Sequence, residues 1–61
     1  MIRYAIKDLE NNSYLTEDMD FSPIIEDAQL YFSKEFAVAL SNKFTKPLTV
    51  VKVELREVEE I

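Results

Sequence analysis

The chain has 61 residues and a formal charge of −5, so it forms one small domain at most and is poorly suited to non-specific binding of nucleic acid or anionic lipid. It contains no Cys, His or Gly, which excludes disulfides, the usual zinc and iron ligands and every glycine-rich phosphate loop. No apolar run approaches the ~20 residues of a membrane span, and the first residues lack a signal-peptide pattern, so we expect a cytoplasmic protein without metal or cofactor.

Residues 2–7 alternate between apolar and polar or small side chains, which predicts a half-buried strand. The residues on its buried face are Ile2, Tyr4 and Ile6. Asn tolerates a positive φ better than other residues with a side chain, so Asn11 and Asn12 can form a two-residue hairpin loop. A return strand over 13–16 follows, and Glu10 then faces Ser13.

The hairpin register also decides which side chains share a face of the predicted sheet. With this loop, Leu15 lies on the face of Ile6, whereas Tyr14 lies on the opposite face with Lys7. After the return strand, residues 17–21 read as an acidic connector.

Residues 23–44 can form one helix or two. Ser22 is a good N-cap, and Pro23 is favoured at the first helical position. One continuous helix is compatible with the apolar spacing, but Ser33 can also cap a second helix over 34–44, with residues 29–32 extended before it. We favour the break. The second helix would then turn Phe36, Ala37, Leu40 and Phe44 inward.

Pro47 ends the helical region, and the following residues alternate as a last strand. The predicted fold is α+β, with a three-stranded antiparallel sheet in the order 2-1-3 (β-β-α-β) and one helical layer on one face. Residues 1–61 form one domain, of which 57–61 are expected to fray. The face under the helix would carry Ile2, Tyr4, Ile6, Leu15, Val51, Val53 and Leu55.

The acidic residues are concentrated in one part of the chain, because Asp8 to Ser33 holds seven acids and no base. The segment that starts at Asp18 opens like a calcium-binding loop, but Pro23 stands where the loop needs Gly, and Gln29 stands where it needs Glu. We therefore interpret these acids as a solvated surface rather than a metal site. Without His, and without a predicted cleft that would shift carboxyl pKa values, we predict no enzyme.

Two surfaces are candidates for binding. The candidate protein-binding residues are Glu17, Asp18, Asp20, Tyr31 and Phe32. The open sheet face offers bases and an aromatic ring, as some RNA-binding sheets do. The alternatives are a plain solvated face and a homodimer face that uses Tyr14, Leu9, Ala5 and Val50. The candidate residues of this face are Arg3, Lys7, Tyr14, Lys52 and Arg56.

The segments YAIKDLENNSYLT and IEDAQLYFSKEFAVAL resemble those of small, mostly uncharacterised proteins borne by phages and prophages of Gram-positive bacteria. Such proteins begin with a Y-x-I-K strand and a short hairpin, and continue with a D/E-A-x-x-Y/F-x-S/T-K-E-x-A segment and a Val/Glu-rich strand. The resemblance covers nearly the whole chain. It implies a phage-related origin, a β-β-α-β fold, no assigned activity and a helix that opens at S-K-E. Phe36 replaces the more usual polar residue of that segment.

We therefore expect a non-catalytic, acidic interaction protein, phage-derived and acting in the host cytoplasm, that binds a host or phage protein or a second copy of itself. Its carboxylates could stand in for phosphates at a nucleic-acid-binding site of a host enzyme. The alternatives are a nucleic-acid-binding module that uses the basic sheet face and a structural homodimer. If the helix breaks before Ser33, Tyr31 and Phe32 cannot both point inward.

Overall fold

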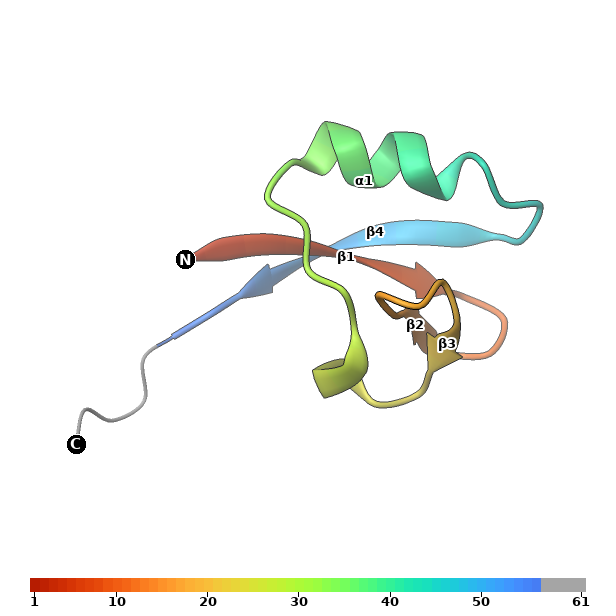
Figure 1. The fold of residues 1–61 in the computed structure, drawn as a ribbon, viewed down its shortest axis with the longest axis horizontal. Coiled ribbons are helices and arrows are strands. Elements are labelled where there is room, and N and C mark those ends of the chain that lie inside the picture. Colours follow the sequence, from red (N-terminus) through yellow and green to blue (C-terminus); the bar gives the residue numbers. More distant parts are fainter. Residues whose placement is uncertain (57–61) are drawn as a thin grey trace.

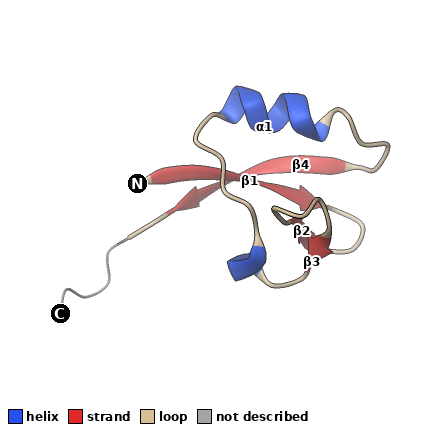
Figure 2. Cartoon of the chain, viewed as in Figure 1, coloured by secondary structure: helices blue, strands red, loops and turns tan. Residues whose placement is uncertain are grey.

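The computed structural model describes residues 1–56 as a small α+β domain, and the expected fraying of 57–61 lies outside the described residues. A four-stranded antiparallel sheet in the order β3-β2-β1-β4 carries one α-helix on one face (Figure 1; Figure 2). The elements are β1 (Ile2–Asp8), β2 (Ser13–Leu15), β3 (Phe21–Ser22), the 3-10 turn η1 (Ile25–Asp27), α1 (Lys34–Ser41) and β4 (Leu48–Glu54).

The predicted order 2-1-3 is right for the neighbours β2, β1 and β4, but the predicted number of strands is wrong. A further short strand, β3, pairs with β2 and sets Leu15 opposite Phe21. It occupies part of the stretch that was expected to connect the hairpin to a helix. The chain therefore returns along β2 before it crosses toward α1.

The hairpin loop between β1 and β2 has four residues rather than two. Asp8 lies opposite Ser13, which is a shift of two residues from the predicted register. A shift by an even number keeps every side chain on its face, so Leu15 still shares the face of Ile6. The loop widens because the Asp8 carboxylate accepts backbone N–H groups from Glu10 and Asn11 within it.

The prediction of the inward face of β4 is wrong. Ile6 lies opposite Val50, and Ala5 lies opposite Val51, so Val50 faces α1 while Val51 and Val53 lie on the other face. Both faces of β4 are covered, so apolar residues follow one another along the strand. The sequence is therefore compatible with either set of alternating residues facing α1. The segment around η1 covers the second face, where Ile25, Ala28 and Leu30 line an apolar cleft with Val53 and Leu55.

Residues 23–44 form two pieces, as favoured from the sequence. Ser33 is the N-cap of α1, and its hydroxyl accepts the N–H of Phe36 at 3.2 Å. Before it the chain is extended, and Tyr31 and Tyr4 exchange two backbone hydrogen bonds of 2.8 and 2.9 Å. The first piece is a single 3-10 turn instead of an α-helix, because Ser22 belongs to β3.

The core lies between α1 and the sheet. Its fully buried members are Ile6, Leu15 and Ala37. Leu40 and Phe44 pack against this cluster as predicted, although α1 ends at Ser41. Phe36 was expected to point inward, but it is 57% exposed. Within the described residues, no helix is long and apolar enough to cross a membrane.

Candidate functional site

An acidic cleft of about 580 Å³ lies between the β2–β3 turn and η1. The carboxylates that line it are Glu17, Asp18, Asp20, Glu26 and Asp27. The sequence-predicted acids Glu17, Asp18 and Asp20 are thus brought together with two further acids from η1. None of the described residues that line the cleft is basic, so its carboxylates have no cationic partner among them.

The β2–β3 turn is held by backbone hydrogen bonds across Thr16 to Asp20. The N–H of Thr16 donates to the Asp20 carbonyl at 2.9 Å, and the N–H of Met19 donates to the Thr16 carbonyl at 3.1 Å. Met19 has φ 62°, the left-handed conformation that closes a three-residue hairpin loop and is usually taken by Gly or Asn. Glu17 and Asp18 therefore project from a fixed turn at the rim of the cleft.

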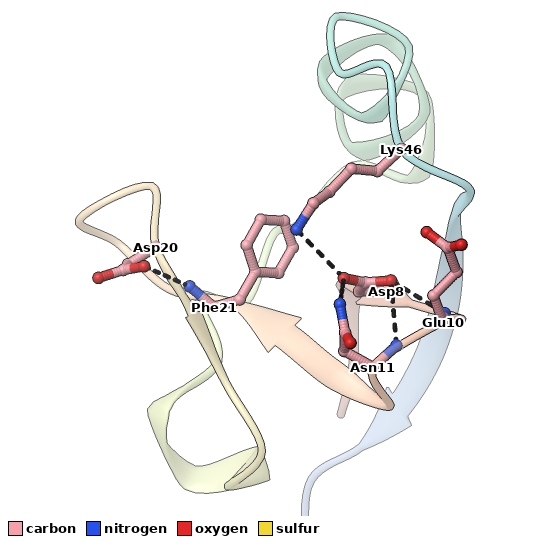
Figure 3. A network of polar contacts seen from close by, with 6 residues as sticks. All are labelled: Asp8, Glu10, Asn11, Asp20, Phe21 and Lys46. Carbon is pink, nitrogen blue, oxygen red and sulfur yellow. Dashed lines mark hydrogen bonds and ion pairs between the residues drawn. The ribbon is translucent and has the colours of Figure 1, made fainter.

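The carboxylates of the cleft differ in their hydrogen bonds. The Asp20 carboxylate accepts the N–H of Phe21 at 3.0 Å (Figure 3). Asp27 accepts the hydroxyl of Ser22 at 2.8 Å. Glu17, Asp18 and Glu26 are exposed, which leaves their charges accessible to a ligand.

An apolar groove of about 400 Å³ adjoins the cleft and shares Glu17 and Gln29 with it. Its other lining residues are Met19, Tyr31, Phe36 and Leu40. The side chain of Met19 is 53% exposed, so the groove offers apolar surface to solvent directly beside the carboxylates. Sequence reasoning missed this groove, because it joins the β2–β3 turn to one side of α1.

Tyr31 and Phe32 do not both point inward, as expected for a broken helix. Tyr31 lines the groove, its ring lies 5.6 Å from that of Phe36, and its burial raises its pKa above the ordinary value of 10.0. Its hydroxyl is buried and has no hydrogen-bond partner among the described residues. Phe32 is 79% exposed, and the guanidinium carbon of Arg3 lies 3.9 Å from its ring centre.

The predicted basic sheet face is divided by the register of β4. Lys7 and Tyr14 lie opposite each other on the same face as Arg3, and the Lys7 ammonium is 5.7 Å from the Tyr14 ring centre. Lys52, however, lies opposite Tyr4 on the face that carries α1. Arg56 forms an exposed ion pair with Glu54 at 2.8 Å. The five residues therefore do not make one binding surface.

A polar network that the sequence did not predict lies beside the acidic cleft (Figure 3). The fully buried Asp8 accepts a hydrogen bond from the Asn11 side chain at 3.0 Å and lies 3.3 Å from the Lys46 ammonium. The Lys46 ammonium also lies 4.2 Å from the Phe21 ring centre. The hydrogen bond from Asn11 is the main cause that lowers the pKa of Asp8 below 3.8. This network is structural, because its charges satisfy each other.

Comparison with known proteins found no matching family model, no similar curated protein and no similar solved structure. The described residues also contain no group of three or more acidic, His or Cys side chains placed to hold a metal ion. The acidic cleft and the adjoining apolar groove are therefore interpreted from their own residues.

Proposed function

We propose that this chain is a non-catalytic interaction module that binds a basic, partly apolar segment of another protein. The observation that carries the proposal is the junction of the acidic cleft with the apolar groove. Five carboxylates line the cleft, and exposed Met19 and Phe36 line the groove beside it. A segment that carries both Lys or Arg and apolar side chains matches this surface.

Each half of the surface contributes differently to recognition. Uncompensated carboxylates attract and orient a cationic partner, and their effect weakens as salt rises. Met adapts its shape to varied apolar side chains, and aromatic rings supply buried area on binding. The residue types support a non-catalytic role, because the chain has no His or Cys, two residue types that commonly serve as a base or a nucleophile.

The resemblance to phage-borne proteins supports a host protein as the partner. A host surface that binds nucleic acid is basic, and carboxylates of the acidic cleft would stand in for phosphates there. The alternative nucleic-acid-binding role has less geometric support, because Lys52 lies on the opposite sheet face from Arg3 and Lys7.

A synthetic peptide of alternating Lys-rich and Leu-rich turns, titrated at low and moderate salt, tests the proposal. In one variant Glu17 and Glu26 are both changed to Gln, because neither side chain makes a hydrogen bond to another of the residues 1–56. The matched control changes Glu10 and Glu35 to Gln, which removes the same charge outside the cleft. The amide oxygen introduced by Glu35→Gln can still accept the Ser33 hydroxyl, which Glu35 accepts at 3.2 Å. We expect the first variant to lose roughly fivefold to tenfold in affinity and the control to lose little.

The two variants distinguish binding of the peptide at the acidic cleft from its attraction to the net negative charge of the chain. Equal losses in both would mean that bulk negative charge, and not the cleft, attracts the peptide. No salt-dependent binding by the wild-type chain would overturn the proposal.

A further inference from the structure

One long edge of the sheet is open. β4 pairs with β1 along one side, and among residues 1–56 no strand pairs with its other side. Leu55 donates its N–H to the Met1 carbonyl at 2.7 Å and accepts from the Met1 amino group at 3.1 Å, so odd-numbered residues here face β1. Because hydrogen-bonding direction alternates along a strand, Val50, Lys52 and Glu54 present their backbone groups to the open edge.

This edge belongs to a part of the sheet that carries exposed apolar side chains. Figure 1 shows β4 continuing past the N-terminal end of α1, where β1 is its only neighbouring strand among residues 1–56 and the η1 segment lines its face away from α1. At this end Met1, Ile2 and Leu55 are 71%, 39% and 36% exposed. A ribbon of two strands is marginal unless further strands or a packed layer support it. The structure therefore leaves both backbone groups and apolar area for an added strand.

We propose that β4 pairs antiparallel with β4 of a second copy of this chain, about a two-fold axis at Val53. In this register Lys52 lies opposite Glu54 of the partner subunit, and Glu54 lies opposite Lys52 of the partner subunit. Val51 then faces Leu55 of the partner subunit on the sheet face away from α1. The two sheets become one sheet of eight strands, with both helices on the same side.

The charges of β4 select this register among those that the hydrogen bonds permit. If the two-fold axis moves from residue 53 to residue 52, Lys52 lies opposite Lys52 of the partner subunit. If it moves to residue 51, Lys52 lies opposite Val50 of the partner subunit and has no charge partner. Charged residues ordinarily protect an edge strand from pairing. Here the charges have opposite sign two residues apart, so they repel in one register and attract in another. Glu54 keeps its contact with Arg56, since a carboxylate accepts several hydrogen bonds.

The proposed dimer is independent of the proposed function. The acidic cleft involves β3, which lies at the opposite edge of the sheet from β4. Pairing through β4 therefore leaves the acidic cleft of each copy open.

Cysteine cross-linking tests the pairing and its register, because the chain has no Cys of its own. In the proposed dimer Val53 lies opposite its own copy in a non-hydrogen-bonded pair, with Cα atoms about 4.5 Å apart. This separation fits a disulfide, so V53C should form a covalent dimer on mild oxidation. V51C is the matched control: its copies would lie about 14 Å apart and should not cross-link.

Charge exchange supplies a second measurement that does not depend on a thiol. Lys52→Glu and Glu54→Lys each create two like-charge contacts at the two-fold axis and should weaken dimerisation about tenfold in sedimentation equilibrium. The double exchange restores opposite charges and should return the wild-type association. Circular dichroism confirms that each variant is folded.

The outcomes are distinct. A wild-type chain that sediments as a monomer up to about 1 mM would overturn the proposal. Cross-linking of V51C in place of V53C would overturn the register. A double exchange that stays as weak as the single variants would show that these charges do not meet.

Discussion

The buried carboxylate of Asp8 lies 3.3 Å from the ammonium group of Lys46, 38 residues further along the chain. This ion pair joins the end of β1 to the segment that leads into β4. The side chain of Lys46 is 42% exposed, whereas that of Asp8 is fully buried. Asp8 therefore depends on its partners, because a buried charge without them is costly.

The stability of the chain should fall in acid through Asp8. Its pKa in the folded protein is lowered, mainly by the Asn11 side chain, so the unfolded chain binds a proton more readily. The stabilisation is present above the unfolded value near 3.8 and is lost as pH falls through the lower folded value. Urea unfolding between about pH 6 and pH 2 measures this loss.

Asp8→Asn serves as the matched comparison for this titration. It should unfold at lower urea than the wild type at neutral pH, and its stability should change less with pH in the acid range. An unchanged acid dependence in this variant would assign the effect to other carboxyl groups.

Ser33→Ala should destabilise the chain by about 1 kcal/mol, because it removes the oxygen that accepts the Phe36 N–H at the start of α1. Ser33→Asp should retain most of the stability, since Asp also caps helices. Urea midpoints of the three proteins measure the difference. Equal midpoints for Ser33→Ala and the wild type would contradict the role of the cap.

Met19→Gly should raise the free energy of unfolding by up to about 1 kcal/mol, because Gly takes a φ of 62° without strain. The same change removes a side chain from the apolar groove and should weaken binding of the Lys/Leu peptide. Met19→Ala separates the two effects, since it loses the side chain but keeps the strain. A Gly variant no more stable than the Ala variant would argue against strain at this turn.

Tyr31→Phe should leave stability unchanged or raise it by up to about 1 kcal/mol, because the hydroxyl is buried without a partner among the described residues. It should also reduce the loss of stability in alkali. Burial raises the Tyr31 pKa, so its stabilisation is present below 10.0 and is lost as pH rises through the folded value. Urea unfolding at neutral and alkaline pH measures both effects, and a clear loss of stability at neutral pH would reveal an unseen partner of the hydroxyl.

Local patterns predicted the parts of the fold that depend on neighbouring residues. The alternation of residues 2–7 defined β1, and Ser33 marked the start of α1. β3 escaped prediction because its preceding turn uses Met19 in a conformation that usually signals Gly or Asn, and because Ser22 followed by Pro23 is typical of a helix start. The two faces of β4 could not be told apart from Val50 and Val51, since these adjacent residues are both apolar.

The candidate site was predictable only where its residues are close in sequence. Glu17, Asp18 and Asp20 stand in one acidic stretch, so the acidic surface was expected. The apolar groove depends on contacts between the β2–β3 turn and α1, which no local pattern encodes. No local pattern encodes the ion pair of Asp8 and Lys46 either, because 38 residues separate them.

The pairing of β1 with β4 has a consequence for the order of folding. Ala5 meets Val51, and 51 − 5 gives a separation of 46 residues, so this contact closes a loop that contains most of the described chain. Closing such a loop costs conformational entropy before any packing compensates for it. During synthesis, β1 cannot pair with β4 until β4 has left the ribosome. Until then its β4-facing backbone groups stay unpaired, which exposes the chain to aggregation.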